Sequence, residues 1–287
     1  MKTFLASEIP DLPAADCLFH IIPAPYEKTV SYGGGAAQGP AAILEASYQL
    51  EAYDGVSCPC TNGIHTHPAQ DSLELMEREI AGVLNQQKIP VMLGGEHTVT
   101  VAALHALKAT GEAIGIIQFD AHADLRADYE GDAWSHACAL HHAVEMNFPL
   151  FQIGVRSLSL PEVELRKEKK IPYLDGYEIG RTGIPDDFLP VDFPEKVYIT
   201  IDVDGLDPAI MPATGTPEPG GLDWFQLFHC LEQITAAKTV VGFDVVELAP
   251  IPNLHAPDFL CARMIYNLMG LISRKLVAGN EIGQGTR

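Results

Sequence analysis

Residues 113–124 constrain the fold of this chain more than any other stretch. Residues 113–119 form a largely apolar run with one glycine, which is typical of a buried β-strand. The run is followed by Asp120, His122 and Asp124, each two positions from the next. In an extended backbone that spacing directs side chains to one side, so two carboxylates and an imidazole can converge on a divalent metal ion.

Two further predicted strands are followed by residues of the same kind. Residues 197–201 are apolar and β-branched for the most part, and Asp202 and Asp204 come directly after them. Residues 89–93 form another apolar strand, and two glycines and a glutamate separate it from His97, which precedes a predicted helix over 98–107. Ligands of open α/β sheets bind at such strand-to-helix junctions. The three stretches therefore predict one polar site at the carboxyl ends of the strands.

Predicted strands and helices alternate along the whole chain, and no change in composition indicates a linker. We expect a single domain over residues 1–287, with a mostly parallel sheet between two helical layers, a three-layer α/β/α arrangement. The other predicted strands are 17–22, 150–155, 171–174 and 239–246, and the other predicted helices are 41–50, one capped by Asp71, 135–144, 224–236 and 259–276. Residues 179–194 are predicted to be rich in loops, and residues 202–221 to form a long ordered loop.

The charge balance limits the possible partners. Acidic side chains exceed basic ones, and the formal net charge is −20. This charge argues against nucleic acid or an anionic membrane as a partner. It is compatible with a small cationic substrate, and equally with a role in solubility alone.

The N-terminus and the cysteines indicate a cytoplasmic protein. The first residues lack the apolar segment of a signal peptide, and no apolar run is long enough to cross a membrane. The six cysteines are scattered without a disulfide framework, as expected of reduced thiols.

A possible zinc motif occurs near the N-terminus, with Cys58 and Cys60 followed by His65 and His67. Its CxC and HxH spacings differ from the usual CxxC and HxxxH spacings of zinc sites. A turn signal, Asn62-Gly63, also interrupts it. We interpret the segment as a structural loop and strand.

The candidate ligands at the strand ends favour two metal ions rather than one. Four carboxylates held close together would repel one another unless cations neutralised them. Two ions about 3.5–4 Å apart could use all the ligands and would turn a water molecule between them into a hydroxide nucleophile. Oxygen ligands with only two imidazoles favour Mn²⁺ over Zn²⁺. The six candidates are His97, Asp120, His122, Asp124, Asp202 and Asp204.

Three motifs of this chain resemble the signature motifs of the ureohydrolase (arginase/agmatinase) family. They are Gly94-Gly95-Glu96-His97, Asp120-Ala121-His122-Ala123-Asp124 and the segment 201–208, IDVDGLDP. The loop 212–222 and the segment 242–250 are also similar to that family. The resemblance implies an arginase-like fold and hydrolysis of a guanidinium group.

The resemblance also implies which residues hold two Mn²⁺ ions per chain. One ion would be held by His97, Asp120, Asp124 and Asp202, and the other by Asp120, His122, Asp202 and Asp204. Asp120 and Asp202 would then bridge the two ions.

Three residues have implied roles in catalysis. Asp124 would also accept a hydrogen bond from the hydroxide. His136 matches the histidine that passes a proton to the leaving amine. Glu247 matches the glutamate that binds the guanidinium, an arrangement that suits a planar cation with paired donors.

One departure from the arginase pattern narrows the range of possible substrates. Arg126 stands where arginases have an asparagine that holds the amino-acid head, which makes arginine a poor candidate. The neighbouring loop resembles those of agmatinases, so the first choice is hydrolysis of agmatine to putrescine and urea. The family also suggests a homotrimer or homohexamer.

Other functions remain open from the sequence. Within the family, the substrate could be guanidinobutyrate, guanidine, aminopropylagmatine or a formimino compound. Outside it, a single-zinc deacetylase or a non-catalytic metal-binding protein would use part of the same ligand set.

Overall fold

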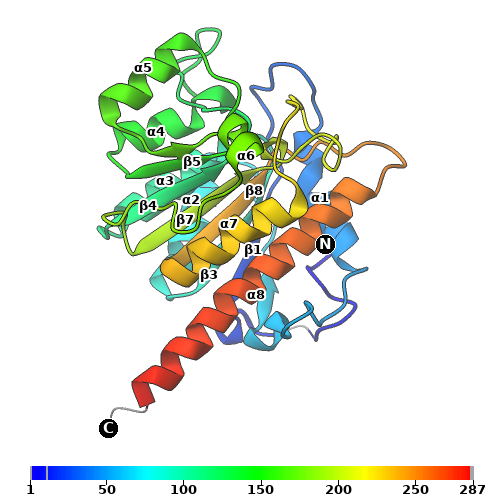
Figure 1. Ribbon diagram of the computed structural model, residues 1–287. Coiled ribbons are helices and arrows are strands. Elements are labelled where there is room, and N and C mark those ends of the chain that lie inside the picture. Colours follow the sequence, from blue (N-terminus) through cyan, green and yellow to red (C-terminus); the bar gives the residue numbers. More distant parts are fainter. Residues whose placement is uncertain (1, 11, 285–287) are drawn as a thin grey trace.

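The fold is built on one eight-stranded sheet in the order β2-β1-β3-β8-β7-β4-β5-β6, and every strand pair is parallel (Figure 1). The computed structural model describes residues 2–10 and 12–284, with side chains described to residue 276; Met1 and residues 285–287, the ends of the predicted domain, lie outside it. The strands are β1 Phe19–Ala24, β2 Ile64–Thr66, β3 Ile89–Gly94, β4 Ile114–Phe119, β5 Leu150–Ile153, β6 Tyr173–Leu174, β7 Lys196–Asp202 and β8 Thr239–Val246.

Helices cover both faces of this sheet, which confirms the predicted three-layer α/β/α arrangement. One face contacts α1 Gly39–Ser47, α7 Trp224–Ala237 and α8 Ala256–Gln284, and α7 and α8 lie side by side there (Figure 1). The other face contacts α2 Leu73–Asn85, α3 Val99–Ala109 and α4 Ala139–Glu145. Two further helices are α5 Leu160–Lys169 and α6 Gly176–Thr182.

The central strands are apolar because they are buried on both faces. Every residue of β1, β3 and β4 is buried. Along β1, Phe19 and Ile21 contact the core beneath α1 and α8, whereas Ile22 and Ala24 contact the core beneath α2 and α3. A strand covered on both sides gives a continuous apolar run rather than an alternating pattern.

The structure differs from the sequence predictions where helices bury little apolar surface. Helix α6 begins before the region 179–194 that is predicted to be rich in loops and extends into it, and its buried residues are only Gly176 and Ile179. Helix α5 buries Glu162 and Arg166 rather than an apolar stripe, so no helical periodicity marks it. A capping box between Ser159 and Glu162 starts it instead.

The loop 202–221 after β7 is predicted to be ordered, and hydrogen bonds from one guanidinium group hold it in place. Arg156, which follows β5, donates hydrogen bonds of 2.7 Å to the carbonyl oxygens of Asp204 and Glu218. It also donates to the carbonyls of Gly205 and Pro219. One half-buried cation thus fastens both ends of the loop to the end of β5.

In the part of the chain that the structure describes, no helix combines the length and the apolar character needed to cross a membrane.

The start of α2 corrects one predicted cap. The Ser72 hydroxyl, not the Asp71 carboxylate, accepts the hydrogen bond from the Leu75 backbone N–H. We expect Ser72→Ala to lower the free energy of unfolding by about 1 kcal/mol. The exposed Asp71 is the matched control, and Asp71→Ala should change the free energy of unfolding by less than about 0.5 kcal/mol. Chemical denaturation of the two variants measures this, and a larger loss in Asp71→Ala would contradict the assignment.

Candidate metal centre and active site

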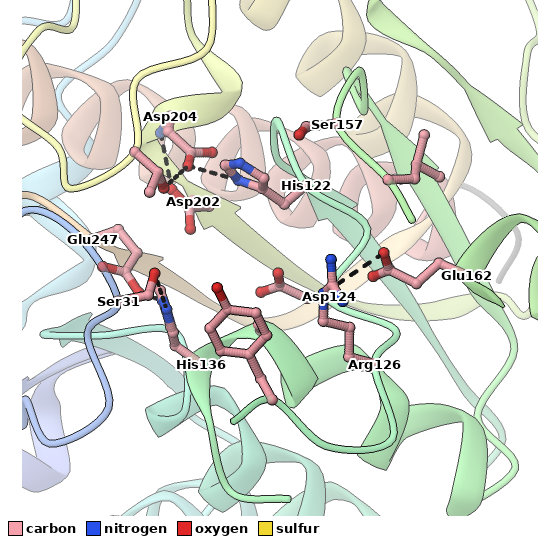
Figure 2. Close-up of a pocket in the computed structure, with 14 residues that line it drawn as sticks. Ser31, His122, Asp124, Arg126, His136, Ser157, Glu162, Asp202, Asp204 and Glu247 are labelled. Atoms are coloured by element: carbon pink, nitrogen blue, oxygen red, sulfur yellow. Dashed lines mark hydrogen bonds and ion pairs between the residues drawn. The ribbon is translucent and has the colours of Figure 1, made fainter. Parts of the chain in front are cut away.

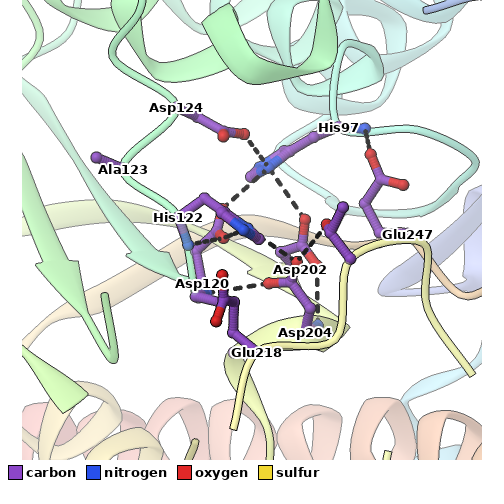
Figure 3. A network of polar contacts seen from close by, with 12 residues as sticks. His97, Asp120, His122, Ala123, Asp124, Asp202, Asp204, Glu218 and Glu247 are labelled. Carbon is purple, nitrogen blue, oxygen red and sulfur yellow. Dashed lines mark hydrogen bonds and ion pairs between the residues drawn. The ribbon is translucent and has the colours of Figure 1, made fainter. Parts of the chain in front are cut away.

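The candidate ligands lie at the carboxyl ends of three strands and meet in one place (Figure 3). Asp120 comes directly after β4, Asp202 is the last residue of β7, and His97 lies between β3 and α3. These strands lie close together because the order of the sheet is β3-β8-β7-β4. The structure therefore brings the three sequence motifs together at one edge of the sheet, as the sequence predicts.

The first group of ligands surrounds the His97 ring. Its Nδ1 atom lies 2.9 Å from Asp124 Oδ2, 3.2 Å from Asp120 Oδ2 and 3.5 Å from Asp202 Oδ2. All four residues are buried. Among the described residues, His97 Nδ1 has no partner in good hydrogen-bond geometry. A buried imidazole nitrogen that faces three carboxylates fits a site for a cation.

The second group shares Asp120 with the first. His122 Nδ1 lies 3.0 Å from Asp204 Oδ2 and 3.6 Å from Asp120 Oδ1. The ligand atoms of Asp120, His122 and Asp204 lie within 4.8 Å of one another, as do those of His97, Asp120 and Asp202. The two oxygens of Asp120 thus face two adjacent positions, each of which could hold one metal ion.

The electrostatics of the cluster also indicate cations. Burial raises the pKa of Asp202 well above its ordinary value, and the charges of Asp204 and Asp120 raise it further. Burial and the charge of Asp120 raise the pKa of Asp124 to about 6. Burial likewise opposes ionisation of Asp120, but hydrogen bonds to His122 and His97 outweigh it and lower the pKa of Asp120. All these carboxylates can be ionised together at neutral pH only if positive charge lies between them.

A buried network behind the cluster fixes the His97 ring. His97 Nε2 lies 2.9 Å from Thr200 Oγ1, and the Thr200 hydroxyl donates to Asp244 Oδ1 at 2.6 Å. Asp244 also accepts hydrogen bonds from Tyr198 and Thr100. The network places the ring proton on Nε2 and leaves Nδ1 free to bind a metal, an arrangement typical of metal-ligating histidines.

Glu96 and Gly95 position the loop that closes over the site. The Glu96 carboxylate accepts hydrogen bonds from the backbone of Lys28 and Thr29 and from the Thr29 hydroxyl. The hydroxyl of Thr29 accepts in turn from the backbone N–H of His136. A Cβ atom at Gly95 would lie 2.0 Å from the carbonyl oxygen of Tyr26, so only glycine fits where these segments cross.

A cavity of about 240 Å³ opens above Asp124, Asp202 and Asp204, and His136 and Glu247 stand together on its wall (Figure 2). His136 Nδ1 lies 3.1 Å from Glu247 Oε1, and His136 Nε2 lies 3.3 Å from the Ser31 hydroxyl. Burial opposes protonation of His136, but the hydrogen bond and charge of Glu247 outweigh it and raise the pKa of His136. Glu247 Oε1 also accepts from the His97 backbone N–H at 2.7 Å, which leaves Oε2 for another donor.

The opposite wall of the cavity contains Arg126, which the sequence singles out, together with Tyr129 and Glu162, which it does not. Arg126 lies 4.0 Å from Glu162 and over the ring of Tyr129, 5.2 Å from its centroid. Glu162 is buried and accepts a hydrogen bond from the Leu125 backbone. Tyr129 and Glu162 lie outside the metal motifs, as does Ser31 beside His136 on the first wall, and only the folded chain brings them to one cavity.

Comparison with known proteins agrees with this geometry. The model of the Arginase family matches residues 18–270. The chain is 37% identical to the N(1)-aminopropylagmatine ureohydrolase of Synechocystis, over 94% of this chain and 93% of that protein. It is 30% identical to the agmatinase of Pyrococcus horikoshii, over 93% and 96% of the two chains.

Solved structures show the same relationship. The agmatine ureohydrolase of Thermoplasma volcanium superposes with a TM-score of 0.84 at 28% identity, covering 97% of this chain and 96% of that one. The match of the family model, the sequence relatives and the shared fold lead to one conclusion. The chain belongs to the arginase family, as its motifs predict, and is a hydrolase that acts on amidino carbon–nitrogen bonds.

Proposed function

We propose that this protein hydrolyses agmatine to putrescine and urea with two Mn²⁺ ions, and so serves polyamine biosynthesis. The observation that carries the proposal is the pair of cation positions on either side of Asp120, at the base of a cavity whose wall contains His136 and Glu247. A guanidinium bound at Glu247 would have its central carbon next to the metal centre.

Oxygen ligands dominate both positions, which supports Mn²⁺. His97, Asp120, Asp124 and Asp202 would hold one ion, and Asp120, His122, Asp202 and Asp204 the other. When bound, the two ions would acidify a water molecule and neutralise the carboxylates.

The residues of the chain would then bind the substrate and move protons. Glu247 would bind the guanidinium through its carboxylate, which suits a planar cation with paired N–H donors. Asp124 would accept a hydrogen bond from the attacking oxygen and orient it. His136, whose pKa is raised mainly through Glu247 against the effect of burial, would hold a proton for the leaving amine.

Charge supports a substrate that is cationic at both ends. The net charge of −20 raises the local concentration of small cations. Arg126 in the cavity wall lies near Glu162, so its charge is partly balanced. Arg126 also stands where arginases have the asparagine that holds the head group of arginine, which disfavours arginine as the substrate.

A second candidate substrate is N(1)-aminopropylagmatine. Relatives of that name are 33–37% identical to this chain over more than 90% of it, and agmatinases are 30–34% identical over 79–93% of it. Both substrates present the same guanidinium to Glu247 and differ in the length of the chain beyond it. The residues around Arg126 would decide between them. The cytoplasmic location and the trimeric or hexameric state stay predictions.

Urea release from a panel of guanidino compounds with added Mn²⁺ tests the substrate. We expect the highest kcat/KM for agmatine and the lowest for arginine, with guanidinobutyrate and guanidine as the intermediate comparisons. A higher value for N(1)-aminopropylagmatine would favour the second candidate. Absence of urea from every compound would favour a non-catalytic metal-binding protein.

Removal of a shared ligand tests the two-metal assignment. We expect Asp120→Ala and Asp202→Ala to lose both ions, because each carboxylate would contact both. The loss of metal catalysis amounts to several kcal/mol, so urea release should fall by about a thousandfold or more. Elemental analysis and kinetics measure the two effects. Near-normal activity in either variant would refute the bridging role, and one metal per native chain would revive the single-zinc deacetylase.

Substitution of His136 separates proton transfer from metal binding. His136→Ala should retain two ions and lower kcat by about a hundredfold to ten-thousandfold. His105, an exposed histidine on α3, provides the matched control, and His105→Ala should leave kcat unchanged. An unchanged kcat in His136→Ala with both metals bound would make His136 a structural residue.

A further inference from the structure

A second cluster of imidazoles lies outside the catalytic cavity, where β1 and β2 pair. His20 lies opposite His65 in the register of the two strands, and His67 follows two residues later, with its backbone N–H bonded to Ile21. The ring centroids of His20, His65 and His67 are 4.8–5.7 Å apart. The three rings therefore lie together on the face of the sheet that α2 covers, since His67 also contacts Glu79 of that helix.

The ring protons of His67 and His20 can be assigned one after the other from their hydrogen-bond partners. His67 Nδ1 lies 2.9 Å from the Glu79 carboxylate, which can only accept, so Nδ1 carries a proton. In the neutral ring His67 Nε2 is then an acceptor, and it lies 2.8 Å from His20 Nδ1, which must donate. In that tautomer His20 Nε2 is a lone pair in a residue that is 1% exposed, and no described group donates a hydrogen bond to it. His65 Nδ1 is also buried without a partner.

A metal ion bound between His20 and His67 would remove the unsatisfied lone pair on His20 Nε2. If the ion replaced the proton between His20 Nδ1 and His67 Nε2, both of these nitrogens could offer lone pairs to it. His20 could then carry its proton on Nε2, where the backbone of Cys17 favours the protonated ring. Glu79 would accept from the other nitrogen of a ligating histidine, as carboxylates near metal-bound imidazoles commonly do.

His20 and His67 are in the protonation state that metal binding requires. Burial is the main cause that lowers the pKa of His20 to about 4, and it has the same effect on His67. Neutral imidazoles bind metals without first releasing a proton to solvent. Strand β2 is at the edge of the sheet, and His65 and His67 are partly exposed, so an ion can reach them.

We propose that His20, His65 and His67 form a binding site for one late first-row transition-metal ion, of the Ni²⁺ or Zn²⁺ class. Three nitrogen ligands suit these ions better than Mn²⁺, which distinguishes the site from the oxygen-rich catalytic centre. His65 would complete the site only after its side chain rotates, because the ring nitrogens of the three histidines do not all lie within 4.8 Å of one another in this structure. The ligand set does not include the cysteines of the CxC motif, because Cys60 contacts Tyr266 of α8 on the opposite face of the sheet.

Nickel binding to the Mn²⁺-loaded enzyme tests this proposal. In excess Mn²⁺, calorimetric titration with Ni²⁺ should show one binding event per chain. We expect His67→Ala to abolish it and Glu79→Gln to weaken it about tenfold to a hundredfold. The matched control is His229→Ala, which removes a partly exposed histidine on α7 and should bind Ni²⁺ as the native chain does.

Anomalous diffraction at the nickel edge provides the location independently of activity. A peak between the rings of His20 and His67 is expected in the native protein and absent from His67→Ala. A nickel signal confined to the catalytic centre, or uptake unchanged in His67→Ala, would overturn the proposal. Urea release should be the same in His67→Ala and the native chain, so failure of this site and failure of the proposed reaction are distinguishable.

Discussion

The structure depends on compensating several negative charges that are buried in one place. Asp120, Asp124, Asp202 and Asp204 are each at most 7% exposed, and their carboxylates converge on the same small volume. Burial alone makes isolated carboxylates costly, and mutual repulsion adds to that cost. Two histidines cannot balance four such groups, which is why the cluster fits metal ions. A chain folded around this cluster would gain stability from bound cations, which would also supply the chemistry proposed for the site.

The parallel sheet makes this concentration of charge possible. Parallel strands bring their carboxyl ends to one edge, so residues from positions 97, 120 and 202 meet without long connecting segments. Interactions behind the ligands hold them there. Asp244 and Thr200 orient His97 from the core, while Arg156 fastens the segment that contains Asp204. The chemistry at the edge is therefore supported by polar groups buried in an otherwise apolar core.

The ligand set could be predicted from sequence because each motif combines an apolar strand with polar residues directly after it. Asp120, His122 and Asp124 stand out for that reason. Asp244 does not, since it lies within the apolar strand β8 and its three hydroxyl partners come from α3 and β7. Glu162 and Ser31 were also missed, because their contacts with the cavity arise only in three dimensions. Helix α5 could not be predicted from the sequence for a related reason. It buries charged side chains instead of apolar ones, so it has no helical periodicity of apolar residues.

The number and position of the metal ions test the central claim most directly. Crystals grown with Mn²⁺ and measured at the manganese edge should give two anomalous peaks per chain, about 3.5–4 Å apart. One peak should lie near His97 and Asp124 and the other near His122 and Asp204, with Asp120 between them. A single peak, or manganese bound away from these residues, would contradict the account.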